Sequence, residues 1–210
     1  MVIRGMAGVK YKFDHFSTSL ALEPLRRAKL NGLDVTAGVS IHHLTLNEMD
    51  IGDYRTFFKI KPPLRSESDR VAMVEAIADG TIDIISSMHT PQDEESKRLP
   101  YEEAASGAVG LETILSASLQ LFHNGSISLP QLFRALSLNP AKRFNLPGGT
   151  LELESQADLV LFDPDAPFVL NRFALNSKSK NTPYDETLMQ GKVIKTFVNG
   201  YEVFGDSLGE

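Results

Sequence analysis

The feature that most constrains the fold of this chain is an alternation of strand-like and helix-like segments over residues 9–87. Short apolar stretches of β type occupy residues 9–15, 35–41 and 81–87, and segments with helical spacing occupy residues 20–30 and 70–78 between them. A capping box at Ser66 to Asp69 precedes the second helix. Strands that alternate with helices in this way form parallel sheets through right-handed crossovers. The sequence therefore predicts an α/β fold built on a parallel sheet.

The third strand runs directly into a polar loop, Ser87 to Gln92, that contains a proline. This layout places reactive side chains at the mouth of an α/β barrel. The mouth position itself holds Met88. A thioether can neither take a proton from water nor supply the negative charge that a hard cation needs. The sequence thus predicts an enzyme-like scaffold without the usual reactive group at this point.

The rest of the chain changes from helical to β character near Pro147. Helices are predicted over residues 109–122, 129–136 and 140–144, and strands over residues 150–153, 157–164, 168–170 and 192–203. Asn199-Gly200 interrupts the last stretch as a two-residue hairpin turn. We therefore expect two parts, a barrel-type part at residues 1–147 and a β-rich accessory segment at residues 148–210.

Composition excludes several classes of function. The net charge of -6 argues against a nucleic-acid surface, because phosphate binding needs clustered Lys and Arg. The absence of cysteine excludes disulfides and thiolate metal sites. The sequence has neither an apolar run of bilayer length nor a signal-peptide pattern at its start. We therefore expect a cytoplasmic globular protein.

Several motifs in order along the chain resemble the dihydroorotase family of the amidohydrolase superfamily. They are His15-Phe16-Ser17-Thr18, Val35-Thr36-Ala37 through His42-His43-Leu44, Pro62-Pro63-Leu64-Arg65-Ser66, Asp79-Gly80-Thr81-Ile82-Asp83, Gly110-Leu111-Glu112-Thr113, Ala157 to Pro164 and Ser179 to Tyr184. The resemblance covers nearly the whole chain and corresponds to the C-terminal portion of a dihydroorotase. It implies the second half of a (β/α)₈ barrel of TIM type, followed by a small β-sandwich-like segment.

The resemblance also implies chemistry and site residues. Dihydroorotases interconvert dihydroorotate and N-carbamoyl-aspartate in pyrimidine synthesis, with one or two divalent metals, usually zinc, that activate a water molecule. By position, His15 corresponds to a metal-ligand histidine and Met88 to the proton-transferring aspartate. The resemblance implies substrate contacts at Lys61, His89, Gln92 and Gly107.

Other family features have no counterpart in the sequence. It has no His-x-His pair, and it contains only five histidines. Because Met88 replaces the family's aspartate and most metal ligands are missing, we expect no catalytic residue and no zinc retained by this chain alone.

Three interpretations remain open. The chain is a working amidohydrolase completed by another dihydroorotase chain or subunit, or a non-catalytic scaffold that partners aspartate transcarbamoylase, or the product of a decayed gene. An open half barrel would expose strand edges, so we expect either a completing partner or poor stability.

Each histidine also has a structural explanation. His15 could simply be a hydrogen-bonded histidine at a strand end, and Lys61 could be a solvent-facing lysine. His89 is the best polar candidate near the mouth, but one histidine without an acid partner is weak evidence for catalysis. His42 and His43 are predicted to lie on a strand, where neighbours point to opposite faces and cannot easily chelate one ion. His123 fits the C-terminal end of a helix, where a cation offsets the helix dipole.

Overall fold

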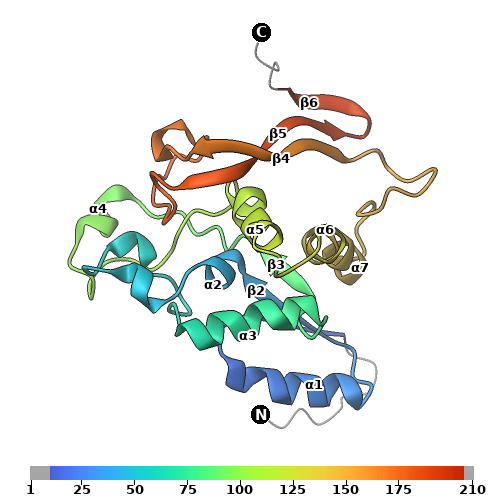
Figure 1. The fold of residues 1–210 in the computed structure, drawn as a ribbon, viewed down its shortest axis with the longest axis horizontal. Coiled ribbons are helices and arrows are strands. Elements are labelled where there is room, and N and C mark those ends of the chain that lie inside the picture. Colours follow the sequence, from blue (N-terminus) through green and yellow to red (C-terminus); the bar gives the residue numbers. More distant parts are fainter. Residues whose placement is uncertain (1–9, 206–210) are drawn as a thin grey trace.

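The computed structural model describes residues 10–205 and contains two separate three-stranded sheets (Figure 1). The first sheet is parallel, in the order β1 (Tyr11–Phe16), β2 (Val35–Ser40), β3 (Ile84–Ser86). The second is antiparallel, in the order β4 (Leu159–Val169), β5 (Leu188–Val198), β6 (Tyr201–Gly205). An α/β fold with a parallel sheet and a β-rich C-terminal part is confirmed, and the three parallel strands do not close into a barrel within the described residues.

Helices connect and cover the two sheets. The α-helices are α1 (Leu22–Leu30), α2 (Ile41–Thr45), α3 (Glu67–Ala78), α4 (Glu94–Arg98), α5 (Ile114–His123), α6 (Leu129–Phe133) and α7 (Asn139–Phe144). Short 3-10 turns cover Ser19–Ala21, Glu48–Ile51, Thr56–Phe58 and Arg172–Ala174, and a π-helical turn covers Arg134–Leu138. In Figure 1, α1 and α3 lie together on one side of the parallel sheet, and α5 lies between this part and the antiparallel sheet. None of the helices within residues 10–205 combines the length and apolar character that crossing a bilayer requires.

Local signals in the sequence set several element boundaries as predicted. The Ser66 hydroxyl accepts a hydrogen bond from the Asp69 backbone N–H and caps α3. Helix α1 ends at Asn31-Gly32, where Gly32 adopts a positive φ of 71°. The Asn199-Gly200 pair also has positive φ at both residues, which is the geometry of a two-residue hairpin between β5 and β6.

Several of the predicted elements are wrong in type or extent, and the strand predicted at 81–87 covers only Ile84–Ser86. Residues 150–153 form no strand, and residues 168–170 are not a separate strand because β4 continues through Val169. The long helix predicted at 109–122 begins only at Ile114, after a turn. The strand predicted at 35–41 ends at Ser40, whose hydroxyl accepts from the His42 N–H and starts α2. His42 and His43 therefore lie on a short helix.

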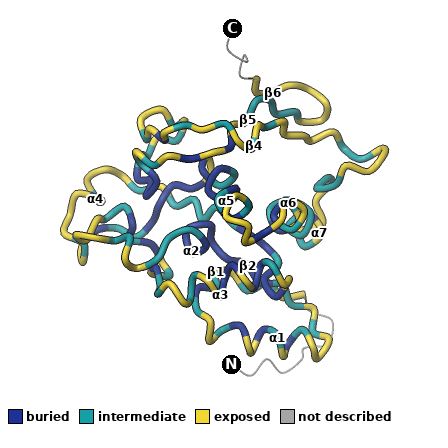
Figure 2. Tube along the Cα trace, in the orientation of Figure 1, coloured by how far each residue is buried: buried dark blue, intermediate teal, exposed yellow. Residues whose placement is uncertain are grey.

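A single apolar cluster joins the helices to both sheets. It includes buried residues of β2, α3, α5 and β5, among them Val39, Met73, Leu119 and Met189. Figure 2 shows this buried centre, with exposed backbone along the outer strands and loops. The C-terminal segment contributes Leu170, Tyr184 and Met189 to the same cluster, while the division at residue 147 stays a prediction.

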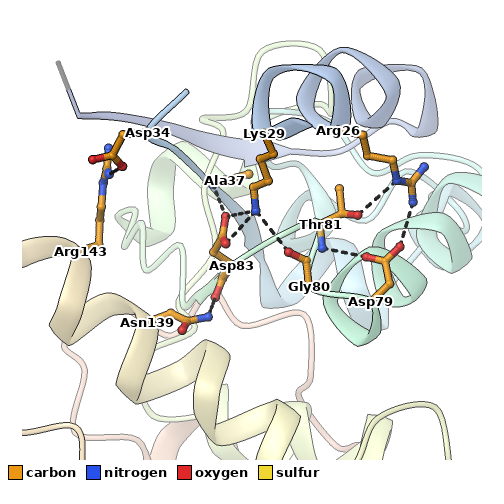
Figure 3. Close-up of polar contacts among 10 residues, drawn as sticks. All are labelled: Arg26, Lys29, Asp34, Ala37, Asp79, Gly80, Thr81, Asp83, Asn139 and Arg143. Atoms are coloured by element: carbon orange, nitrogen blue, oxygen red, sulfur yellow. Dashed lines mark hydrogen bonds and ion pairs between the residues drawn. The ribbon is translucent and has the colours of Figure 1, made fainter. Parts of the chain in front are cut away.

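A polar network holds the amino ends of the parallel strands together (Figure 3). The Asp83 carboxylate accepts two hydrogen bonds of 2.8 Å from Lys29 Nζ and one of 2.8 Å from the Ala37 N–H. Arg143 forms an ion pair of 2.7 Å with Asp34, just before β2. A polar pocket of about 250 Å³ lies beside these groups. Because this end is opposite the carboxyl ends of the strands, we interpret the network as stabilising.

Candidate functional site

The carboxyl ends of β1, β2 and β3 meet at one edge of the parallel sheet. The predicted site residues His15 and Met88 lie at the ends of β1 and β3. Ser40 and Ser86 are register partners at the ends of β2 and β3. His15 lies near the end of β1, and Met88 follows β3 by two residues. Both adopt left-handed backbone conformations, with φ of 60° and 45°. Non-glycine residues rarely occupy this region, and such conformations cluster at functional sites.

His15 is accessible on the edge strand. Its side chain is 42% exposed, and its Nε2 lies 3.9 Å from a carboxylate oxygen of Asp14. The same Asp14 oxygen accepts a hydrogen bond of 2.8 Å from Lys12 Nζ. His15 is therefore available to a ligand but is not held in place by a buried partner.

His89 is fixed more firmly than His15. Its Nδ1 accepts hydrogen bonds of 3.3 Å from the backbone N–H groups of Gly110 and Leu111. A ring nitrogen that accepts carries no proton, so the proton of neutral His89 lies on Nε2. His89 can thus offer one N–H donor to a ligand.

Gln92 and Gly107, two predicted substrate contacts, lie side by side. A Cβ atom added to Gly107 would lie 2.6 Å from the Thr90 carbonyl oxygen and 3.0 Å from Gln92 Nε2. Gly107 also has a φ of 147°, which favours glycine. The backbone of the loop at Thr90 to Gln92 can therefore approach the backbone at Gly107 closely because residue 107 has no side chain.

Lys61 is exposed and follows a loop that buried Lys97 anchors. Lys97 Nζ donates to the carbonyl oxygens of Thr56, Lys59 and Ala105, at 2.9, 3.3 and 2.8 Å. Burial, together with the nearby charge of Lys59, lowers the pKa of Lys97 to about 8. The Gly107 N–H donates to the Lys59 carbonyl at 2.9 Å, so this loop is tied to Gly107. Lys97 was missed because the sequence places it in a charged run that is typical of a solvated loop.

His42 belongs to a buried chain of hydrogen bonds that ends at the late loop. Thr45 Oγ1 donates to the Ile41 carbonyl, so it accepts from the Tyr184 hydroxyl at 2.7 Å. The Tyr184 oxygen in turn accepts from His42 Nδ1 at 3.3 Å, which leaves Nε2 unprotonated. This Nε2 is buried without a partner and faces Gly110, whose added Cβ would lie 3.1 Å away.

Burial, with a smaller effect of His43, lowers the pKa of His42 from 6.5 to about 3. The unfolded chain therefore binds this proton more readily than the folded chain does. Stability from neutral His42 is complete above about pH 6.5 and falls as the pH drops toward 3, by up to about 1.4 kcal/mol per pH unit. Denaturant unfolding from pH 7 to pH 4 is expected to show a smaller slope in His42→Asn than in the parent, and the slope that remains comes from His43 and from carboxyl groups whose pKa is also lowered.

The matched control is His123→Asn, which removes an exposed histidine at the end of α5. This variant is expected to keep the parent slope between pH 6.5 and 4. An unchanged slope in His42→Asn would contradict the assignment of the acid sensitivity to His42.

The described residues do not fit a zinc site. His43 Nε2 lies 3.2 Å from the Pro63 carbonyl, its Nδ1 is buried without a partner, and burial lowers its pKa. Within residues 10–205, no group of three or more His, Cys, Asp or Glu side chains is placed to hold a metal ion. Zinc sites in proteins use three or four protein ligands. His15 alone, with Met88 in place of a carboxylate, does not make such a set.

The arrangement as a whole can bind but offers little acid or base chemistry. The structure brings Gln92 and Gly107 together, ties Lys61's loop to Gly107, and anchors His89 to the residues just beyond. The His89 ring and the Gln92 side-chain amide are the polar groups of this set that suit hydrogen bonding to a ligand. Met88 supplies no proton-transferring group next to them.

Comparison with known proteins finds relatives that match nearly the whole of this chain. The family model described as "Amidohydrolase family" matches residues 15–203. The dihydroorotase of Ehrlichia canis is 41% identical over 199 residues, which cover 95% of this chain and 44% of that protein. The dihydroorotase of Anaeromyxobacter dehalogenans is 40% identical over 207 residues, which cover 95% of this chain and 48% of that protein. The chain thus spans less than half the length of these relatives.

Solved structures agree with the sequence comparison. The L-hydantoinase (dihydropyrimidinase) of Arthrobacter aurescens superposes with a TM-score of 0.90 at 29% identity, over 97% of this chain and 47% of that chain. A D-hydantoinase superposes with a TM-score of 0.82 at 25% identity, over 93% and 45% of the two chains. Both sheets described above therefore match part of a known fold.

Proposed function

The chain belongs to the amidohydrolase family as a homologue of dihydroorotases, and from this membership we propose that it forms the ring-binding part of a dihydroorotase-type site. The ligand is dihydroorotate or its open form, N-carbamoyl-aspartate. The observation that carries the proposal is the junction of His89, Gln92 and Gly107 beyond the carboxyl end of β3.

The available groups suit a cyclic amide with a carboxylate. His89 offers a fixed Nε2–H donor, and Gln92 offers an amide that both donates and accepts. Gly107 is buried, with its N–H bonded to the Lys59 carbonyl and its carbonyl bonded to Asn181, so it supports the site by letting the two loops approach closely. The Lys61 ammonium can attract a carboxylate. A small apolar cluster of Phe58, Ile60, Leu64 and Ala108 supports the loop that carries Lys61.

We propose further that this polypeptide does not hydrolyse the ring by itself. The family is metal-dependent, with zinc as the usual metal, and the described residues do not supply a zinc ligand set. Met88 stands where the resemblance implies the proton-transferring aspartate, and a thioether cannot perform that step.

The test uses the purified 210-residue chain with added zinc. We expect no interconversion of dihydroorotate and N-carbamoyl-aspartate by chromatography, because residues 10–205 supply no zinc ligand set and Met88 cannot transfer a proton. Weak dihydroorotate binding is expected, seen as NMR shifts at the amides of Gln92 and Gly107. Turnover at rates typical of dihydroorotases would disprove inactivity, and the absence of shifts would disprove ring binding.

A second candidate is a non-catalytic scaffold, which a separate surface favours. Apolar side chains are exposed at the free end of the antiparallel sheet, among them Val160, Leu161, Tyr201, Val203 and Phe204. Exposed apolar groups next to strand edges indicate an interaction surface. The proposed partner is aspartate transcarbamoylase or a completing dihydroorotase chain. Zinc-independent co-elution with aspartate transcarbamoylase, without ring binding, would favour the scaffold.

A further inference from the structure

Asn181, in the late loop before β5, is buried and bonded to both loops of the proposed ring site. The Asn181 residue is 2% exposed. Its Oδ1 accepts from the Gln92 N–H at 3.2 Å, and its Nδ2 donates to the carbonyls of Gly107 at 3.1 Å and Thr90 at 3.4 Å. Its own carbonyl accepts from the Val109 N–H at 3.1 Å.

The hydrogen-bond pattern fixes the orientation of this amide. The nitrogen faces two carbonyl oxygens, and the oxygen faces a backbone N–H. A flipped amide would place an oxygen against two carbonyls and a nitrogen against an N–H, and both contacts are repulsive. Only a side chain with an acceptor and a two-proton donor at these places satisfies all three backbone groups.

We propose that Asn181 is a positioning residue that sets the separation of the Thr90–Gln92 and Gly107–Val109 loops, and so the geometry with which Gln92 meets a ligand. The part of this inference that concerns the ligand rests on the function proposed above. The two loops also bond directly, through the Thr90 N–H and the Ala108 carbonyl at 2.8 Å. Without the amide, the carbonyls of Thr90 and Gly107 would face each other in a buried space, and the loops would separate.

Asn181→Asp tests the proposal because it keeps the shape of the side chain and replaces the Nδ2 donor of two hydrogen bonds with an acceptor. The ionised carboxylate still accepts from the Gln92 N–H but repels the carbonyls of Gly107 and Thr90. At pH 7 we expect hydrogen exchange at the Thr90 and Val109 amides to rise at least about tenfold, after correction for intrinsic rates. When the carboxyl is protonated at lower pH, its O–H can donate to the Gly107 carbonyl, and protection is expected to return toward that of the parent at the same pH.

Asn124→Asp is the matched control, since Asn124 is exposed and its side-chain oxygen only accepts, from the Ser126 N–H. It is expected to leave exchange at Thr90 and Val109 unchanged. Asn181→Leu, which cannot be protonated, is expected to lose protection at every pH. Asn181→Asp could unfold completely at pH 7. In that case the variant is folded at low pH, where the carboxyl is protonated, and then jumped to pH 7. Exchange at the Thr90 and Val109 amides must then rise before exchange at the Val39 amide of the core.

Three outcomes would overturn the positioning role. These are parent-like exchange in Asn181→Asp at pH 7, the same loosening at all pH values, and equal loosening in Asn124→Asp. Dihydroorotate is then titrated into parent and variant, with about a tenfold weaker affinity expected for Asn181→Asp at pH 7 that recovers as the carboxyl is protonated. Failure of the parent to bind dihydroorotate would count against the proposed function alone, because the exchange data decide the role of Asn181 separately.

Discussion

A chimeric dihydroorotase is expected to turn over at least about a hundredfold faster with aspartate than with methionine at position 88. The chimera is the Ehrlichia canis enzyme in which the segment that matches the present chain is replaced by residues of this chain. The rest of the chimera is the Ehrlichia canis sequence. The reason is that a carboxylate can transfer a proton and a thioether cannot. Loss of such a group typically costs about a hundredfold to ten-thousandfold in rate. The measurement is kcat for dihydroorotate with Met88 and with Met88→Asp.

Met49→Asp in the same chimera serves as the control, because Met49 is 79% exposed and belongs to the 3-10 turn Glu48–Ile51 instead of the loop after β3. This change is expected to leave the rate at the level of the Met88 chimera. Equal rates for the Met88 and Met88→Asp chimeras would contradict the placement of Met88 at the proton-transferring position. Inactivity of the Met88→Asp chimera would contradict the broader proposal that this chain carries a competent part of the site.

Leu119→Ala is expected to lower the free energy of unfolding by about 2–5 kcal/mol. Leu119 lies on α5, is fully buried, and packs against Gly191 of β5. Ser116, one turn earlier, donates from its hydroxyl to the Gly191 carbonyl at 2.8 Å. Truncation leaves a cavity at the contact between the helix and the antiparallel sheet, so both lose stability. Urea unfolding followed by circular dichroism measures the change.

Leu20→Ala is the matched control, since Leu20 is 86% exposed and the same atoms are removed from a solvated position. Its effect is expected to stay within about 0.5 kcal/mol. A loss below about 1 kcal/mol in Leu119→Ala would show that the contact between α5 and β5 contributes little, because buried leucine truncations typically cost more.

The sequence predicts those parts of the fold that depend on neighbouring residues. The Ser66 cap, the helix end at Asn31-Gly32 and the Asn199-Gly200 turn each arise within a few residues, and the structure has all three. Residues 150–153 show the limit of such reasoning. Their apolar spacing suits a strand, but Leu151 and Leu153 find no pairing partner and stay almost fully exposed.

The sequence suggests the residues of the candidate site, which stay a prediction, but it does not reveal the residues that hold them in place. Met88, His89, Gln92 and Gly107 follow from the strand, the loop and the family resemblance. Asn181 and Lys97 act through hydrogen bonds to backbone groups far along the chain, and no local pattern reveals such partners. His42 was misjudged because a strand was predicted where Ser40 starts a helix. The sequence did show one signal for Asn181, its position in the late loop that resembles the family.

The order of the parallel sheet constrains any polypeptide that extends it. Strands β1 and β3 are its outer members, and each has one side without a strand partner among the described residues. β1 also carries Lys12 and Asp14, charged residues of the kind that discourage indiscriminate pairing at an edge. A strand could join in either direction by hydrogen bonding alone. Only one that runs parallel to β1 or β3 would deliver its own carboxyl end, and the ligands that follow it, to the side where His15 and Met88 lie. The direction of an added strand, more than its affinity, therefore decides whether it completes the site or only covers an edge of the sheet.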